Sequence, residues 1–124
     1  MNNPGLIKSF VCGAAIAPHR IVMFGANDNS MVQATAATDL LVGVSDELGG
    51  NNGGRVDIIL SGVAEVEYGG AVTRGAKLTT DANGKAVATA PVAGVNAHVI
   101  AIAMVSGVLG DIGSALIVPS VMQG

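Results

Sequence analysis

The stretch RVDIILSGVAEVEY, residues 55–68, decides the fold. Its even-numbered positions, from Val56 to Tyr68, are small or apolar, and its odd-numbered positions carry most of its charged groups. Successive side chains of a β-strand point to opposite faces, so this alternation predicts a strand with one buried face and one largely solvated face. The stretch is long for a single strand, and we expect a bulge or bend at Gly62.

A hairpin is predicted further along the chain. The sequence Asp-Ala-Asn-Gly at residues 81–84 joins two short β-like segments, residues 72–80 and 85–90. Asn-Gly favours tight turns because Gly has no Cβ and Asn tolerates the left-handed region. A calcium site would need more acidic ligands in register, and no acidic residue follows Asp81 before Asp111. We therefore interpret the turn as a corner of the fold rather than a metal site.

The hairpin has an earlier counterpart. RIVMFGANDNSMVQATA, residues 20–36, aligns without gaps on RGAKLTTDANGKAVATA, residues 74–90, and both copies begin with Arg and end in Ala-Thr-Ala. Two apolar segments follow each copy. The pattern predicts two pseudo-repeated units, each a hairpin plus strands. The expected fold is all-β, a small barrel-like or β-tulip-like module with little helix.

The composition limits both the core and the partners. The chain has 124 residues, which suits one domain, and half of them are hydrophobic, but only 2% are aromatic. Small side chains bury little area, so we expect a thin core and some apolar surface covered by a partner or by other copies. A net charge of −3, with 12% charged residues, argues against a nucleic-acid-binding surface. The few aromatics also argue against base stacking.

No pattern for catalysis or metal binding emerges. Cys12 is the only cysteine, which excludes an intramolecular disulfide and suggests a small buried hydrophobe. His19 and His98 lack the spacing of a zinc site. Glu65 and Glu67 would lie about 7 Å apart on one strand face, which we interpret as a solvated face rather than a catalytic pair. We expect no enzyme activity, no catalytic residues, no cofactor and no metal.

Two segments imitate membrane or export signals. Residues 86–110 carry no Asp, Glu, Lys or Arg and are long enough for a membrane span, but Pro91, Gly94 and Asn96 divide them into strand-sized pieces. Residues 9–17 end in a small-residue pattern like a cleavage site, yet they lack leucine and follow a single positive charge. We expect neither a membrane segment nor an export signal.

Residues 1–9 are predicted to form an N-terminal arm ahead of a single β domain, residues 10–124. The start of the chain has no apolar periodicity, and Pro4 removes a backbone donor, so the arm is expected to order on a partner. Extended segments of this kind can add a strand to a neighbour. The candidate arm residues are Asn2, Asn3, Pro4, Gly5, Leu6 and Ile7.

A candidate oligomer interface lies near the end of the chain. Residues 99–105 are apolar at both odd and even positions, which is typical of a strand buried on both faces. With a thin core, this run predicts self-association. The candidate interface residues are Val99, Ile100, Ala101, Ile102, Ala103 and Met104.

Several stretches together resemble the small capsid decoration, or cement, proteins of tailed bacteriophages and prophages, over about residues 10–120. They are SFVCGAAIAPHRIVMFG (9–25), ATAATDLLVGVSDELG (34–49), GGRVDIILSGVAEVEYGG (53–70), VTRGAKLTTDANGKAVA (72–88) and GDIGSALIVPS (110–120). The resemblance implies a β-rich homo-oligomer, expected to be a trimer, on the outside of the virion head. It would bind the major capsid protein between capsomers through the arm and stiffen the shell, after synthesis in the bacterial host cytoplasm.

Three other functions stay open at this point. A phage tail-tube protein or another accessory virion β-module has similar composition, and a hexameric ring in isolation would favour it. A secreted module that binds a host surface would show N-terminal processing. An enzyme would need a convergent polar cluster, which the sequence does not provide.

Overall fold

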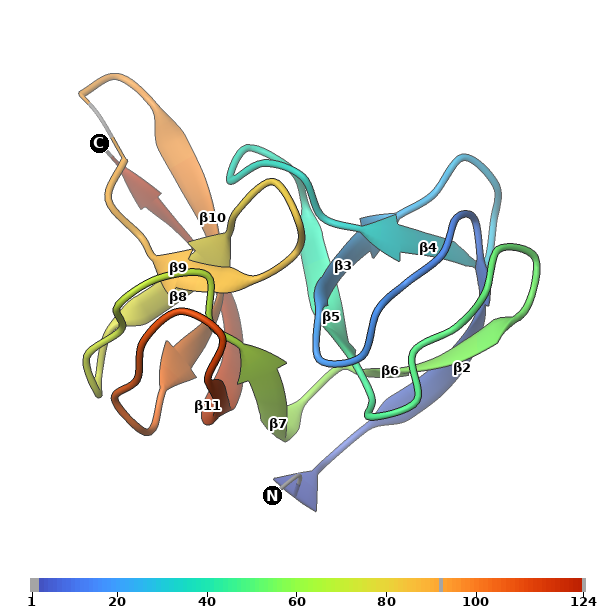
Figure 1. The fold of residues 1–124 in the computed structure, drawn as a ribbon. Helices are drawn as coiled ribbons and strands as arrows, with labels where there is room; N and C mark the ends of the chain where they lie inside the picture. Colours follow the sequence, from blue (N-terminus) through green and yellow to red (C-terminus); the bar gives the residue numbers. More distant parts are fainter. Residues whose placement is uncertain (1–2, 92, 124) are drawn as a thin grey trace.

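The computed structural model describes residues 3–91 and 93–123, and these residues form strands joined by turns and loops, with no helix (Figure 1). This confirms the all-β prediction. The strands are β1 (Asn3–Pro4), β2 (Ile7–Cys12), β3 (Ile21–Phe24), β4 (Ser30–Gln33), β5 (Leu41–Ser45), β6 (Arg55–Ile59), β7 (Gly62–Glu67), β8 (Lys77–Thr80), β9 (Ala86–Ala88), β10 (Asn96–Ala103) and β11 (Ile112–Gln123).

Strands β2 to β6 form the first unit, a closed barrel with the strand order β2-β4-β3-β5-β6. The β3–β4 hairpin and the antiparallel β3–β5 and β5–β6 pairs make up most of the wall. Strand β2 closes the barrel because it pairs antiparallel with β6 on one side and parallel with β4 on the other. Closure leaves this unit without a free sheet edge.

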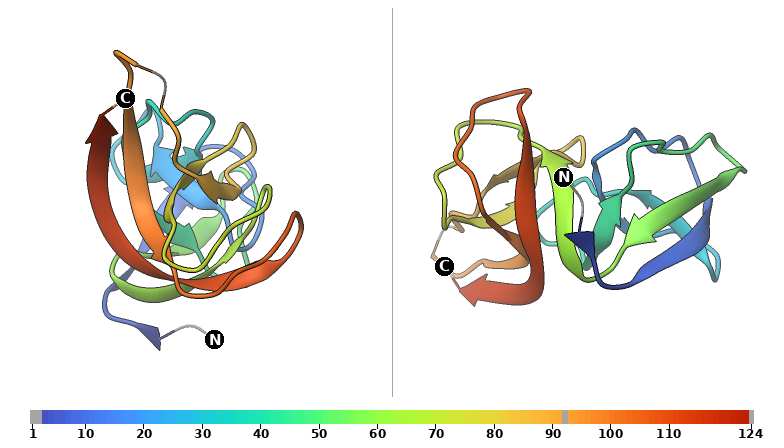
Figure 2. Two further views of the ribbon diagram at one scale, coloured as in Figure 1. Left: turned by 90° about the vertical axis from the view of Figure 1, so that its left-hand side faces the viewer. Right: turned by 90° about the horizontal axis from the view of Figure 1, so that it is seen from below.

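Strands β7 to β11 form the second unit, in the order β7-β11-β10-β8-β9. The first unit has the same order when its barrel is read in the other direction, as β2-β6-β5-β3-β4. The β8–β9 hairpin corresponds to β3–β4, and β10 and β11 correspond to β5 and β6. The parallel contact that would close this unit is reduced to one bridge between Tyr68 and Ala86. Strand β1 adds to the free side of β7 and makes the sheet six-stranded. The two lobes lie side by side in Figure 2, and their strand order agrees with the predicted repeat.

The predicted strand over residues 55–68 is wrong in one respect, because it is two strands in two different sheets. Strand β6 ends at Ile59 in the barrel, and β7 begins at Gly62 in the second unit. Gly62 has a φ of 85°, a left-handed conformation that favours glycine and redirects the chain. The alternating pattern continues through the break, so periodicity alone gave no sign of the change of sheet.

Two hydrophobic clusters hold the units together. The smaller cluster fills the barrel and includes Phe10, Met31 and Ile58. The larger cluster combines the inner face of the second unit with barrel residues such as Ile21, Leu41 and Ile59. Ile59 thus occupies an odd, nominally solvated position of the 55–68 pattern, and the second unit covers it. Alanines are frequent in the larger cluster, in line with the thin core expected from composition.

The predicted Asp-Ala-Asn-Gly corner is the β8–β9 turn, and it also joins the two units. Gly84 has a φ of 76°, and its carbonyl accepts a hydrogen bond from the Ile21 amide at 2.7 Å. The Asn83 carbonyl accepts hydrogen bonds from the Arg20 guanidinium at 3.0 Å and the Gln33 amide at 3.2 Å. The turn of the second hairpin is therefore docked on the first hairpin.

Candidate functional site

Three parts of the surface are candidates for binding (Figure 1). The loop between β10 and β11 lies beside Tyr68, just past the end of β7, whereas β1 pairs with the start of β7. The C-terminal part of β11, beside the start of β10, projects at the other end of the second unit. Figure 2 shows the molecule from below, with β1 toward the viewer. We call residues 104–111 the apolar loop, and residues 96–99 of β10 with residues 120–123 of β11 the ribbon.

The apolar loop presents large hydrophobic side chains to solvent. Val108 and Leu109 at its tip are 60% and 67% exposed, and Met104 and Val105 are also exposed. Exposed apolar side chains continue into β11 at Ile112 and Leu116. Contiguous exposed apolar surface is characteristic of a protein–protein contact.

Hydrogen bonds give the apolar loop a fixed shape. The Tyr68 hydroxyl donates to the Val105 carbonyl at 2.7 Å, and the Gly110 amide donates to the Tyr68 carbonyl at 2.9 Å. The Asp111 carboxylate accepts a hydrogen bond from the Val108 amide at 2.9 Å. Tyr68 is fully buried, and desolvation, together with the nearby Asp111 charge, raises the pKa of its hydroxyl. The loop is thus held ready for binding, which lowers the entropy cost of docking.

The predicted arm lies against its own chain where the structure describes it. The backbone of Asn3 and Pro4 pairs with Val63 and Gly62 of β7. The Gly5 amide donates to the Ser61 carbonyl, and the Leu6 carbonyl accepts from the Leu60 amide. Asn2 lies outside the described residues.

Leu6 and Ile7, the proposed apolar anchors, are both about half exposed. Residues 7–9 belong to β2 and pair with β6, so they are part of the barrel wall. The segment that is free to act as an arm therefore ends before Ile7.

The predicted oligomer interface lies in β10 and its end. β10 pairs with β11 along its length and with β8 at Ala101 and Ile102. The apolar pattern on both faces is explained by burial within the chain itself, which leaves Ile102, partly buried, and Met104, 46% exposed, to reach a partner. The four buried members are Val99, Ile100, Ala101 and Ala103.

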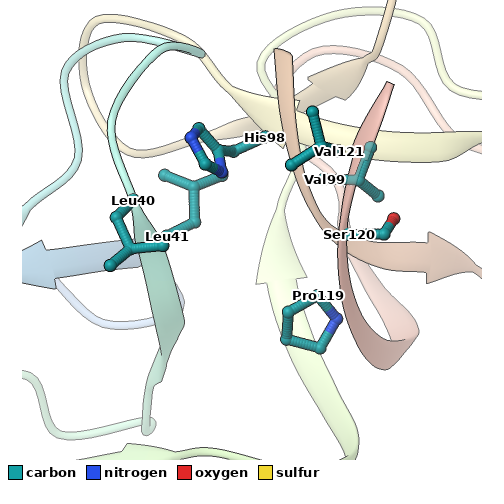
Figure 3. Close-up of a pocket in the computed structure, with 7 residues that line it drawn as sticks. All are labelled: Leu40, Leu41, His98, Val99, Pro119, Ser120 and Val121. Atoms are coloured by element: carbon teal, nitrogen blue, oxygen red, sulfur yellow. The ribbon is translucent and has the colours of Figure 1, made fainter. Parts of the chain in front are cut away.

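A pocket of about 220 Å³ separates the first unit from the ribbon (Figure 3). Leu40 and Leu41, at the start of β5, face β10 and β11 across it. The lining is mostly apolar. The backbone amide of His98 donates a hydrogen bond to the Ala37 carbonyl at 2.8 Å. The residues on the ribbon side are His98, Val99, Pro119, Ser120 and Val121.

Glu65 and Glu67, which were predicted to form a solvated face, lie instead at the joint between the units. Glu67 forms ion pairs with Lys85 at 3.2 Å and Arg20 at 3.4 Å. Burial alone would raise the pKa of Glu67, but the hydrogen bonds and charges of Lys85 and Arg20 outweigh it and lower the pKa. The Glu65 carbonyl lies 3.1 Å from Nδ1 of His19, whose own carbonyl accepts the Glu67 amide. These contacts cover the edge of β7 beyond β1.

The described residues contain no cluster of three or more His, Cys, Asp or Glu side chains able to hold a metal. Cys12 is buried in the barrel, as predicted, and burial raises the pKa of its thiol. In the part of the chain that the structure describes, no helix is long and apolar enough to span a membrane.

Sequence reasoning missed the apolar loop and the pocket. The loop had a signal, because Val108 and Leu109 are large apolar residues between two glycines in a turn, where polar residues are usual. The sequence gives no signal for the pocket, because its two walls are more than 50 residues apart in the sequence and meet only in the folded chain.

The family described as phage cement protein matches residues 3–109. Among solved structures, the chain is similar to the N base of head fiber gp8.5 in bacteriophage phi29, with a TM-score of 0.69 and 18% identity, covering 91% of this chain and 93% of that one. At this identity the likeness supports the fold alone. No curated protein matches the chain.

Proposed function

The chain belongs to the phage cement protein family and is a protein that decorates the outside of the capsid; from this premise we propose that it stabilises the shell by bridging neighbouring shell subunits. A protein that binds the mature state of the shell more tightly than a looser state of the shell shifts the equilibrium toward the mature state. The same contact repeated over a lattice adds avidity.

The observation that carries this proposal is the exposed apolar surface of the apolar loop and of the segment that follows β1. Val108 and Leu109 project from a loop fixed by Tyr68, and Leu6 and Ile7 are exposed next to β1. Buried apolar area stabilises a contact by roughly 25 cal/mol per Å². A fixed loop loses little entropy on docking, so more of that energy remains as affinity.

The arm is the second element of the proposed attachment. Its described part has only short backbone pairing with β7, and such a segment adds little to the stability of the isolated protein. On the shell it can lie along a neighbouring subunit or add a strand to it, with Leu6 as an apolar anchor.

We also propose that the protein self-associates as a trimer. Ile102 and Met104 are the members of the predicted interface that reach the surface, and Leu116 is the cross-strand neighbour of Ile102. Ile102, Met104 and Leu116 form the surface that a second copy would cover, while Val108 and Leu109 at the tip of the apolar loop stay free for the shell. Light scattering at micromolar concentration that detects only monomer would contradict this proposal.

The function is tested on particles by deleting residues 1–6. Because β2 begins at Ile7, the truncated protein is expected to fold with little loss of stability but to bind less tightly to shells that lack it. Particles without the protein, or with the truncated form, are expected to release DNA at a lower temperature than wild-type particles.

Leu48→Lys is the matched control, because Leu48 is 80% exposed on the barrel, outside the arm and the apolar loop. If truncated protein protects particles fully, the arm has no role in attachment. If particles without any of this protein are equally heat-stable, the stabilising function itself is wrong.

A further inference from the structure

The outer edge of β11 is open over its second half. Strand β7 covers this edge only from Ile112 to Leu116, and from there to Gln123 the only described strand that pairs with β11 is β10, on the opposite side. At the usual strand rise this leaves roughly 20 Å of edge. Unpaired N–H and C=O groups along an edge are a template for another strand.

Other edges of the described fold are shorter or partly covered. The barrel is closed, β1 pairs with one end of β7, and His19 occupies the next positions of that edge. Strand β9 is bridged to Tyr68, and the Gly69 amide donates to the Ala86 carbonyl. The second half of β11 is therefore the longest open edge, because the edge strands β1 and β9 have only two and three residues.

Few of the features that usually protect an edge are present on β11. Edges are commonly blocked by charged side chains, but β11 contains no Asp, Glu, Lys or Arg. Pro119 lacks an amide proton, and it sits where the β10–β11 register shifts, so the strand continues past it to Gln123. Val118 and Val121 are exposed apolar residues on this segment.

The pocket lies beside this edge. Pro119, Ser120 and Val121 form part of its wall, and Leu40 and Leu41 face them from the first unit (Figure 3). A chain added along β11 would place alternate side chains on one face, and one of them would reach the pocket. The apolar lining, with no acidic or basic residue except His98, selects an aliphatic side chain on an uncharged segment.

We propose that the open edge of β11 accepts an extended, uncharged segment of the shell protein as an added strand, with an aliphatic side chain in the pocket between the two units. The inference rests on the proposed function, because it names a second shell contact at the end of the molecule opposite the apolar loop. Contacts at both ends let one molecule span a junction between two shell subunits. Backbone pairing supplies affinity in such additions, and the pocket supplies specificity.

Pro119 favours a segment of the shell protein over a second copy of the chain as the added strand. Two β11 edges pairing with each other would place Pro119 of each copy within the paired segment, where a donor is missing from both strands. A strand from the shell protein brings only one such gap.

The experiment measures binding of the full chain to purified shells that lack it. Val121→Lys places a charge on the edge, and Leu40→Lys places one on the facing wall, outside any strand, where folding is not at risk. Each is expected to weaken binding at least tenfold, whereas the barrel-surface control Leu48→Lys leaves it unchanged. Amide exchange over residues 117–123 is expected to slow on the shell.

The outcomes distinguish this inference from the proposed function. Normal binding by Val121→Lys and Leu40→Lys, with weakened binding by Leu109→Lys in the apolar loop, would overturn the edge contact and leave the proposed function standing. No binding of the wild-type protein to shells would overturn both. Protection of residues 117–123 that depends on protein concentration in the absence of shells would assign the edge to a second copy and contradict the proposal.

Discussion

The two units share a strand order but differ in closure and in exposed surface. In the first unit, the parallel β2–β4 pair completes a barrel, whereas in the second the equivalent contact is a single bridge at Tyr68. β10 and β11 are also longer than β5 and β6, and they project as the ribbon. Most of the exposed large apolar side chains belong to the second unit. One topology thus provides a closed support and an open binding unit.

The interiors of the two units differ as well. Phe10, Met31 and Ile16 fill the barrel, whereas the second unit packs many alanines around Tyr68, its largest fully buried side chain. Gly107 and Gly113 pack directly on the Tyr68 ring, where any side chain at either position would collide with it. Tyr68 is therefore the side chain whose loss should most disturb the interior of the open unit.

The largest expected effect is that of Tyr68→Ala. It removes a fully buried ring from the larger cluster and leaves a cavity, so the free energy of unfolding should fall by about 3–5 kcal/mol, as measured by urea denaturation. Because the larger cluster joins both units, a single transition is expected. Separate unfolding of the second unit, with the barrel intact, would show that the two units fold independently.

Tyr68→Phe is the matched variant, because it keeps the ring and removes only the hydroxyl that donates to Val105. We expect a loss of about 1 kcal/mol and faster amide exchange in residues 105–110. Unchanged exchange there would mean that other hydrogen bonds are enough to fix the apolar loop.

A smaller effect is expected at the turn that joins the units. Gly84→Val places a β-branched residue at a φ of 76°, and its Cβ would lie 3.0 Å from the Ile21 carbonyl, so the expected loss is about 1–3 kcal/mol. Asp81→Ala removes the acceptor of the Asn83 and Lys85 amides, at about 1 kcal/mol. Equal melting temperatures for the two variants would contradict the importance of this turn.

The ion pairs at the joint should give a modest pH dependence. The pKa of Glu67 is lowered in the folded state, so its contribution to stability is complete above the unfolded-state pKa of about 4.5 and is lost as the pH falls through the folded-state value. Glu67→Gln should lower stability at pH 7 by about 1 kcal/mol or less, and it should flatten this acid dependence. An unchanged slope between pH 5 and 3 would assign the dependence to other carboxylates.

The smallest effect is expected at the turn of the first hairpin. Asn29 has a φ of 62°, a conformation that asparagine tolerates, so Asn29→Gly should change stability by no more than about 0.5 kcal/mol. Gly84→Asn should cost more, because the docked turn of the second unit has a carbonyl close to the new Cβ. Equal effects of these two substitutions would mean that the turns differ less than their surroundings suggest.

The sequence alone was sufficient for local features and for the class of fold. The alternation in residues 55–68 predicted the buried positions Val56, Ile58, Ala64, Val66 and Tyr68, and the Asn83-Gly84 pair predicted the hairpin turn, because both depend on neighbouring residues. The displaced copy of residues 20–36 predicted two units of similar topology. The resemblance to cement proteins supplied the function, which the family match supports.

Only the tertiary structure decided which faces of each unit are buried and which segments cover them. Residues 99–104 have the pattern of a strand buried on both faces, and that pattern is the same whether a partner or the chain itself provides the cover. Likewise, nothing within residues 55–68 distinguishes one bent strand from two strands in separate sheets. Burial depends on which distant segments meet, as at Leu41 and Val99 across the pocket, and local periodicity carries no information about those meetings.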